Sequence, residues 1–584
     1  MKGRFPPRLV SAAICRVRLV ALLVVCSFSL AGCAAIPTSS PVTHGVGEIE
    51  TGGAVGMIAQ GPIYGQGPEE LMRGFLLAAQ AGPTASAPFM LAKEYLTPEA
   101  ARNWRPMAGV TVLDGAPHLE ITGGEATPDL VHGTAFGMAV ATVNDDGEYQ
   151  EFEYPVEVTS YFTLQRTDGN WRISDLDDGV LLPAQVFSAS YIPTRIYRPS
   201  ADARYWVTDV RWFPGATWRT NAVQTLFDGA PPWLQDAVLP AAPESAALQL
   251  AEVEAEPGGG YVVSVQGNIR DASAHDRVLL RAQLAATLLG DPNNHNIYLV
   301  DTQGSIPVPD LPVPLVARTS GSARVLADGE VWQVHGRDLI TTSPPGLVPD
   351  NPTGFAFGQG DNQAVVWRVG DNSIVRTYFD DTSEPTTQTL FEGVRVLAPS
   401  MDPYGFVWTG ESDGALQVIS PAWSVHKVTA RWLAGQTVMQ IRVSAEGARL
   451  ALVTQDATGI KLVVAGIIRD GTGTPIGLAA PLVVGGSLHD ISAVAWHDDA
   501  TLAVIGTTAG VRGAYLVGIG GLNNFGGLPR RIPGLEYPKW ITASVGSGNI
   551  LGIDNQGKLH LREAMSLWPL VGPNQTIDLV AYPG

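Results

Sequence analysis

Cysteine is nearly absent from this sequence. Its 584 residues include three cysteines, and two of them, Cys15 and Cys26, precede residue 33. If the segment before residue 33 is removed, Cys33 is the one cysteine left. The remaining chain then cannot form an internal disulfide of the kind that stabilises many small secreted domains. The folded regions must therefore be stabilised by hydrophobic cores, for which 45% hydrophobic residues is sufficient.

Lysine and long apolar segments are also scarce. The chain has six lysines, and from Cys33 onward it carries 32 basic and 56 acidic residues, a net charge of −24. Phosphate groups are bound by clustered Lys and Arg, so this balance argues against nucleic acid as a partner and against attachment to anionic lipid through a basic segment. From Val42 onward no apolar run is long enough to cross a membrane.

The amino-terminal 32 residues have the pattern of a secretion signal. Five basic residues from Lys2 to Arg18 precede a mainly apolar segment of twelve residues, 19–30. This segment is shorter than the roughly 20 residues that a membrane-spanning helix needs, so it indicates a cleaved signal peptide over residues 1–32.

The residues Leu30-Ala31-Gly32-Cys33 resemble the lipobox of bacterial lipoproteins. The resemblance implies that Cys33 becomes the mature first residue and carries lipid, as an S-diacylglycerol and N-acyl (palmitate-type) cysteine. We therefore expect a protein anchored to the cell membrane on its extracytoplasmic face. The alternative is an ordinary secreted protein whose signal happens to contain a cysteine.

Residues 33–67 are rich in Gly, Pro, Ser and Thr, which is typical of a flexible tether with a reach on the order of 30 Å. Residues 68–194 are predicted to form an α+β domain that resembles the small NTF2-like fold. Pro68-Glu69-Glu70 and Thr97-Pro98-Glu99 are typical helix starts, the second capped by Thr97. Strand-like segments follow at 110–113, 133–143, 153–166 and 171–174, with Asp168-Gly169 as a hairpin turn.

Residues 195–321 alternate between strand-like and helix-like patterns. Strands are expected at 205–213, 261–265 and 296–300, and helices at 220–229, 231–239 and after Ser273. Ser273 and Asp276 form a capping-box pattern before leucines at four-residue intervals. This order, with the sequences LFDGA at 226–230 and YLVD at 298–301, resembles the GerMN domain of sporulation and germination proteins, which implies an α/β fold.

Residues 322–584 lack the helical pattern and repeat a turn followed by an apolar segment. Aligned positions of the repeats lie 34, 41, 44, 52 and 48 residues apart at Val331, Val365, Phe406, Leu450, Leu502 and Ile550. This period predicts an all-β propeller with one four-stranded sheet per repeat and about six blades, five or seven being possible. Residues 443–447 are similar to the "SPDG" turn of propellers. A β-sandwich with accidental periodicity is the alternative.

No local pattern in the chain satisfies the needs of a catalytic or metal site. Asp175, Asp177, Asp178 and Gly179 look like the start of a calcium loop, but the twelfth position, which an EF-hand fills with Glu, is Val186. We interpret them as a solvated turn.

Two further patterns are also interpreted as turns. His489 with Asp490, and His497 with Asp498 and Asp499, lack the spacing of zinc ligands. Gly471-Thr472-Gly473 is followed by Ile476, where a dinucleotide fingerprint requires glycine.

There is no G-x-S-x-G element and no free thiol in the mature chain. We therefore predict no enzymatic activity, no metal and no cofactor. A catalytic pair of carboxylates remains as an alternative, because the two acids of a glycosidase are defined by their distance in space and not by their spacing in the sequence.

Several tryptophans are candidates for packing or for an interaction surface. Trp332, Trp367 and Trp408 are expected at corresponding strand positions of the blades and to pack there. Trp212, Trp218 and Trp233 are close together in the sequence, and a surface formed by such a group is the alternative to core packing.

The full order of lipobox, tether, α+β domain, GerMN-like segment and propeller resembles the LpqB lipoprotein family of mycobacteria and other actinobacteria. The resemblance implies an accessory protein of the MtrA/MtrB two-component system that contacts the extracellular domain of the sensor kinase and affects cell-envelope homeostasis and division. Two alternatives remain: a cell-wall glycan binder or hydrolase that uses the propeller channel, and a structural spacer.

Overall fold

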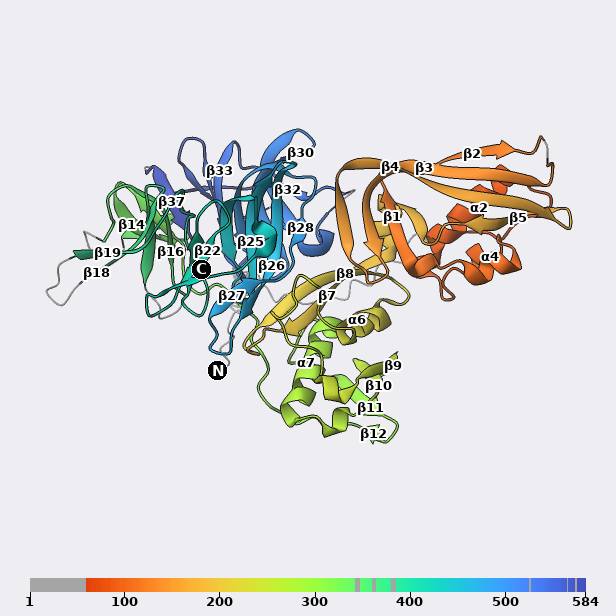
Figure 1. The fold of residues 1–584 in the computed structure, drawn as a ribbon, viewed down its shortest axis with the longest axis horizontal. Helices are drawn as coiled ribbons and strands as arrows, with labels where there is room; N and C mark the ends of the chain where they lie inside the picture. Colours follow the sequence, from red (N-terminus) through yellow and green to blue (C-terminus); the bar gives the residue numbers. More distant parts are fainter. Residues whose placement is uncertain are drawn as a thin grey trace, which may run out of the picture. The chain divides into compact units, whose positions relative to one another are not determined.

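The computed structural model describes residues 59–125, 127–341, 347–359, 364–379, 385–524, 527–564, 566–572 and 575–584. All of them belong to one compact unit of the chain, Gly53–Gly584. No helix in these ranges is long and apolar enough to span a membrane. Figure 1 shows the order of the elements along the chain.

Short helices come first in the amino-terminal region: α2 Pro68–Ala81 and α4 Pro98–Asn103, which were predicted, and α3 Met90–Lys93, which was not. α2 starts at Pro68, and the Glu70 side chain accepts a hydrogen bond from the Gly67 amide. α4 is capped by Thr97, whose hydroxyl oxygen accepts from the Ala100 amide. Proline has no amide hydrogen to satisfy at a first helical position, and the caps satisfy amides that the helix leaves free.

A six-stranded sheet follows, in the order β5-β4-β3-β1-β6 with β2 paired to β3. Only the β1–β6 pair is parallel among these strands. Asp168 and Gly169 both have positive φ (52° and 79°), as a two-residue hairpin turn requires, so this turn prediction is confirmed. The bounds are β1 Gly109–Leu113, β2 His118–Gly123, β3 Leu130–Asn144, β4 Tyr149–Thr167, β5 Asn170–Leu176 and β6 Val180–Pro183.

A two-stranded hairpin, β7 with β8, comes next after the short helix α5. β8 had been expected at 205–213, whereas α5 and β7 had not been predicted. Every residue of β8 is buried, although neighbouring side chains of a strand point to opposite faces. Both faces of β8 must therefore be covered. The bounds are α5 Ala184–Ser190, β7 Tyr191–Pro199 and β8 Trp206–Pro214.

The following segment contains a parallel β-α-β unit. β10 pairs with β11 in parallel and α7 connects them, in a sheet of order β12-β11-β10-β9. Ser273 and Asp276 form the predicted capping box at the start of α7, and Leu280, Leu284 and Leu288 are buried. The bounds are α6 Trp218–Phe227, β9 Gln249–Ala255, β10 Tyr261–Gln266, α7 Ala274–Leu289, β11 Ile297–Asp301 and β12 Gly304–Ser305.

Two helix predictions in this segment need correction. α6 begins at Trp218, two residues before the predicted start at Thr220. Residues 231–239 are not a helix but a series of turns in which Asp236 has a φ of 61°. Trp233 and Leu234 pack there against buried side chains from further along the chain, such as Val464, so burial and not a helix produces the apolar spacing.

Strands between Arg324 and Ala581 form six antiparallel sheets of four or five strands within the described residues. The sheets are, from the innermost strand outward: β37 Ile577–Ala581, β13 Arg324–Ala327, β14 Glu330–His335, β15 Asp338–Thr341; β16 Pro352–Phe357, β17 Val365–Val369, β18 Ser373–Phe379, β19 Pro385–Glu392; β20 Ser400–Met401, β21 Val407–Gly410, β22 Leu416–Ile419, β23 Val425–Lys427; β24 Thr437–Val443, β25 Arg449–Asp456, β26 Gly459–Arg469, β27 Pro475–Leu478 with β28 Leu482–Val484; β29 His489–Trp496, β30 Thr501–Thr508, β31 Val511–Gly518, β32 Arg530–Ile532; β33 Pro538–Ala543, β34 Ile550–Asp554, β35 Leu559–Leu561, β36 Leu570–Val571.

The first of these sheets is closed by the last strand of the chain. β37 pairs with β13, so the carboxy-terminal end supplies the innermost strand and β14 is the third strand. Four of the aligned repeat positions lie in second strands and Phe406 lies directly before one, but Val331 lies in β14, a third strand. The predicted alignment of the first repeat was therefore wrong by one strand.

Candidate functional site

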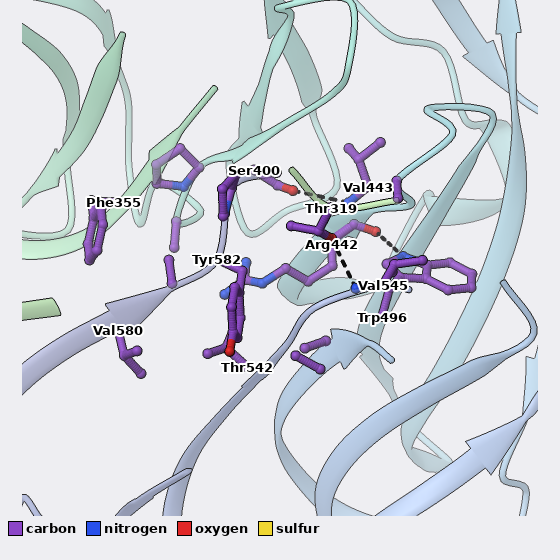
Figure 2. A pocket seen from close by; sticks show the side chains of 18 of the residues that line it. Thr319, Phe355, Ser400, Arg442, Val443, Trp496, Thr542, Val545, Val580 and Tyr582 are labelled. Atoms are coloured by element: carbon purple, nitrogen blue, oxygen red, sulfur yellow. Dashed lines mark hydrogen bonds between the residues drawn. The ribbon is translucent and has the colours of Figure 1, made fainter. Parts of the chain in front are cut away.

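One cavity lies where the innermost strands of all six sheets meet. It has a volume of about 70 Å³, and we call it the channel cavity. β16, β20, β24, β29, β33 and β37 each contribute residues to its lining. Figure 2 shows side chains such as Phe355, Trp496 and Tyr582 around it. All six sheets contribute to the lining, each with a few residues. The lining positions are therefore spread over more than 260 residues of sequence.

Arg442 on β24 is the one charged side chain among the described lining residues. Its Nη1 donates a hydrogen bond to the Ile441 carbonyl oxygen at 2.7 Å, and its guanidinium carbon lies 5.6 Å from the centre of the Trp540 ring. Burial, together with the like charge of Arg368, lowers the pKa of Arg442 to about 10. The guanidinium is therefore still protonated at neutral pH.

The remaining lining is mostly small or aliphatic, and its hydroxyl groups and aromatic rings come from Thr319, Phe355, Ser400, Trp496, Trp540, Thr542 and Tyr582. Ser400 Oγ accepts a hydrogen bond from the Val443 amide at 3.1 Å, and Thr319 Oγ1 accepts from the Val545 amide at 3.0 Å. These bonds use the oxygen atoms and leave the hydroxyl hydrogens to donate. The described lining has no Asp or Glu side chain, so it offers no pair of side-chain carboxyl groups for acid–base chemistry.

Cys33, the predicted lipid attachment site, lies outside the described residues. The predicted tether does so too, apart from its last residues 59–67.

The acidic turn at residues 175–179 is explained by protein contacts. Asp178 pairs with the Arg105 guanidinium and accepts a hydrogen bond from its amide, and these contacts hold the pKa of Asp178 below its usual range. Asp177 accepts from the Tyr161 amide at 3.1 Å. No group of three potential metal ligands occurs among the residues that the structure describes. Asp177 and Asp178 are exposed between β5 and β6, as expected for a solvated turn, whereas Asp175 is part of strand β5.

The two His-Asp patterns make contacts with other regions of the chain. The His489 ring stacks on Tyr154 of β4 with 5.2 Å between ring centres. Asp499 accepts a hydrogen bond from Thr208 Oγ1 of β8 at 2.7 Å, and burial lowers the pKa of His497. Gly471-Thr472-Gly473 forms the turn between β26 and β27, where Asp470 accepts from the Thr472 amide.

The tryptophans are divided among several cores. Trp367 and Trp408 are almost fully buried at matching places in second strands, but Trp332 is only partly buried and lies in a third strand. Trp212 and Trp233 belong to two different hydrophobic clusters, and Trp218 packs against another. They therefore do not gather into one surface, so core packing holds for these residues and the alternative of an interaction surface does not.

Sequence reasoning missed the contacts by which β4 and β8 join the propeller segment, which we call the seam. Trp212 Nε1 donates to the Gly520 carbonyl oxygen at 2.7 Å, and Arg449 Nη1 donates to the Thr208 carbonyl oxygen at 3.0 Å. Gly520 has a φ of 56°, and a Cβ there would lie 2.6 Å from the Val210 carbonyl oxygen, so only glycine permits this approach.

A buried carboxyl group also lies at the seam. Asn524 Nδ2 donates to Glu151 Oε1. Burial raises the pKa of Glu151 to about 7, although hydrogen bonds from Asn524 and from the backbone of residues 485–487 lower it in part. None of the ion pairs among the described residues involves Glu151.

Comparison with known families gives matches in two regions of the chain. Residues 61–188 match the family model "Lipoprotein LpqB, N-terminal domain", and residues 329–555 match "Lipoprotein LpqB beta-propeller domain". The amino-terminal domain is α+β, and the carboxy-terminal sheets are of the propeller type. The class defined by fold and comparison is thus a lipoprotein with a propeller domain.

Several related proteins match this chain over most of its length and identify its family. A lipoprotein LpqB of Bifidobacterium longum is 24% identical over 508 residues, with 85% of each chain covered. One of Thermobifida fusca is 26% identical over 569 residues, covering 84% of this chain and 88% of the relative. One of Mycobacterium ulcerans is 24% identical over 503 residues, covering 80% and 79%. The chain belongs to the LpqB lipoprotein family.

Solved structures resemble only part of the chain. A nidogen/laminin complex matches with a TM-score of 0.33 and 16% identity, covering 44% of this chain and 97% of that one. The WD40 domain of Neurospora crassa Pan2 matches with a TM-score of 0.27 and 12% identity, covering 45% and 79%.

Proposed function

We propose that the protein is held on the extracytoplasmic face of the cell membrane by lipid on Cys33 and binds the extracellular domain of a two-component sensor kinase of the MtrB type. Through this contact it modulates cell-envelope homeostasis and division. The observation that carries the proposal is the match of both the amino-terminal domain and the propeller to one lipoprotein family, in a chain with a lipobox at Cys33.

The proposal includes a finer assignment of the fold. Each of the six sheets is one blade of a six-bladed propeller, closed by the pairing of β37 with β13. The region 68–194 is of the NTF2-like type, and 195–321 is of the GerMN type, with the boundaries expected from the sequence.

The absence of Asp and Glu side chains from the described channel lining supports a binding role over glycan hydrolysis there. A glycosidase needs two carboxyl groups about 5 to 10 Å apart, whereas the described lining provides one arginine, hydroxyl groups and aromatic rings. The reading as a non-enzymatic protein rests on this lining and on the family, which is named for lipoproteins.

The lipid would act by confinement. A tether from Cys33 raises the effective concentration of the folded region near membrane-embedded partners, so a weak contact can be sufficient. The kinase equilibrium shifts only by the difference in affinity of this protein for its two signalling states.

An exposed part of the amino-terminal sheet is the first surface to test. Met138 and Tyr161 are 37% and 64% exposed on β3 and β4, and exposed aromatic side chains are frequent at protein interfaces. The outer side of this sheet thus offers a contact surface that is independent of the channel cavity.

The test is direct binding between the purified chain from residue 59 onward and the extracellular domain of the sensor kinase, by surface plasmon resonance. We expect saturable binding that Tyr161→Ala weakens about tenfold, since a buried interface aromatic can contribute 1.4 kcal/mol or more. Tyr298→Ala, at a tyrosine that is 45% exposed on β11, is the matched control and should bind as the unmodified chain does. No saturable binding by the folded chain would refute the kinase role.

The anchor is tested in cells with Cys33→Ala. The variant should leave the membrane fraction, accumulate outside it and weaken signalling, while the purified folded region keeps its thermal stability. Undiminished membrane retention would contradict lipid attachment at Cys33.

A further inference from the structure

We propose that the channel cavity is a binding site for a carboxylate group, supplied by a small organic acid or by the end of a peptide, and that Arg442 is its principal ligand. Three observations support this proposal: the charge of Arg442, the hydrogen-bond donors around it and the size of the cavity. None of these residues is part of the surface offered above for the sensor kinase.

The first argument is uncompensated charge. The described lining has one guanidinium, on Arg442, and no Asp or Glu side chain. None of the ion pairs among the described residues includes Arg442, whereas the buried Arg449 and Arg211 both pair with carboxylates. Arg368 adds a second positive charge to the field at Arg442. Arg442 is partly buried, and a partly buried cation without an anion partner is costly, so a bound anion would be stabilised at this place.

The second argument is the arrangement of donors. A guanidinium has five N–H donors, and within the described residues the Arg442 guanidinium makes one hydrogen bond, from Nη1 to the Ile441 carbonyl oxygen. Figure 2 shows the Arg442 side chain extending across the cavity toward Tyr582, with Ser400 and Thr319 nearby. The hydroxyl oxygens of Ser400 and Thr319 are already acceptors, so these groups would donate to an anion.

The third argument is size and charge, which favour carboxylate over phosphate. A volume of 70 Å³ admits on the order of five water positions, enough for a carboxylate and the atom attached to it. A carboxylate is planar, carries one charge and matches the planar fork of one guanidinium, whereas a phosphate monoester carries nearly two charges at neutral pH. Trp540 and Phe355 provide apolar lining for the group attached to the carboxylate.

The experiment uses the full chain, labelled with fluorinated tryptophan, and follows the Trp540 signal by fluorine NMR. Trp540 lies against Arg442 and its signal is assigned with Trp540→Phe. The probes are acetate, inorganic phosphate and acetamide, the neutral analogue of acetate, at constant ionic strength. We expect a saturable shift with acetate and none with acetamide. Arg442→Gln should weaken acetate binding at least about tenfold, because it removes a charged hydrogen-bond donor.

The control is Arg530→Gln, which removes the same charge from an exposed position on β32 and should bind acetate as the unmodified chain does. If Arg442→Gln does not fold, Arg442→Lys decides: it keeps the charge but loses the fork, so acetate binding should weaken and remain selective over acetamide. A crystal of the unmodified chain with bromoacetate should show bromine in the channel cavity.

Four results would overturn the proposal. They are an absence of saturable acetate binding, equal response to acetamide, binding unchanged in Arg442→Gln or Arg442→Lys, and bromoacetate located elsewhere. Saturable binding of phosphate without acetate would also reject a carboxylate site and assign the cavity to phosphate groups.

Discussion

Arg449 is fully buried at the seam, and its charge is balanced by one residue. Its Nε donates to Glu446 Oε1 at 2.6 Å, and the guanidinium lies 4.7 Å from the centre of the Trp496 ring. Removing one partner of such a pair leaves an uncompensated charge in a medium of low polarity. Glu446 lies in the turn that resembles the "SPDG" element, so this turn also supports the contact with β8.

Glu446→Gln should lower the free energy of unfolding by about 3 kcal/mol, because Arg449 would stay buried without a counter-charge. The measurement is urea denaturation of the chain from residue 59. Glu563→Gln is the matched control: it breaks the ion pair with Arg337, which is more than half exposed, and should cost less than about 1 kcal/mol. Equal effects of the two substitutions would contradict the role assigned to burial.

Glu151 makes the stability of the seam depend on pH. Its pKa is about 7 in the folded chain, above its usual value of 4.5, so the folded state binds the proton more tightly than the unfolded state. The resulting stabilisation is complete below pH 4.5 and is lost as the pH rises through 7, by on the order of 3 kcal/mol.

Glu151→Gln should therefore melt at a higher temperature than the unmodified chain at pH 8, and the two melting temperatures should converge near pH 5, because glutamine imitates the protonated acid. The measurement is differential scanning calorimetry at a series of pH values. Glu153→Gln, at an exposed neighbour on β4, should show no such pH-dependent difference. A difference that grows toward low pH would reverse the sign and refute the assignment.

Single residues of the channel cavity could not be predicted from the sequence. Arg442, Ser400 and Thr319 lie in different parts of the chain, with no motif connecting them, and only closure of the sheets brings them together. Lipid attachment at Cys33 was proposed from a contiguous lipobox-like signal, and it stays a prediction because Cys33 lies outside the described residues.

Elements with local start signals were the most predictable. Pro68, Thr97 and Ser273 mark helix starts through caps that depend on neighbouring residues only, and the structure has helices at all three. By contrast, residues 231–239 have helix-like apolar spacing but form turns, because the Trp233 carbonyl oxygen accepts from the Gly466 amide and Leu234 is buried by other elements. Tertiary contacts decided the backbone there, and a sequence window does not contain them.

The cap of α7 gives a prediction at the scale of one element. Ser273 Oγ accepts from the Asp276 amide at 3.1 Å, so Ser273→Ala should destabilise the chain by about 1 kcal/mol. Thr217, before α6, makes no side-chain cap to that helix, and Thr217→Ala should cost less. Thermal denaturation compares the two. A larger effect at Thr217 would contradict the importance of the cap.

For the molecule as a whole, the sequence predicted the order of regions but not how they share their cores. One hydrophobic cluster contains Val207, Val210 and Trp233 together with propeller residues such as Val504 and Val517. The repeat period was readable because each sheet has a similar length. The sequence did not show which strand is innermost in the first sheet, because that strand, β37, lies at the other end of the segment.

Separating the propeller from the rest should therefore damage it. A chain of residues 322–584 lacks Val207, Val210 and Trp233 and would expose the apolar side chains that they cover. We expect it to aggregate or to melt well below the chain that begins at residue 59, as measured by size-exclusion chromatography and calorimetry. A monomeric, equally stable propeller would show that the shared cluster contributes little.

The burial of β8 on both faces also limits how such a protein can be inherited. Domains that meet through small polar contacts can be exchanged between genes, because each keeps its own core. Here the strand that follows the amino-terminal domain is part of the propeller's core, and it has side chains of both partners against it. A recombination event at the boundary near residue 195 would join surfaces that do not match, so the regions are expected to descend together as one evolutionary unit.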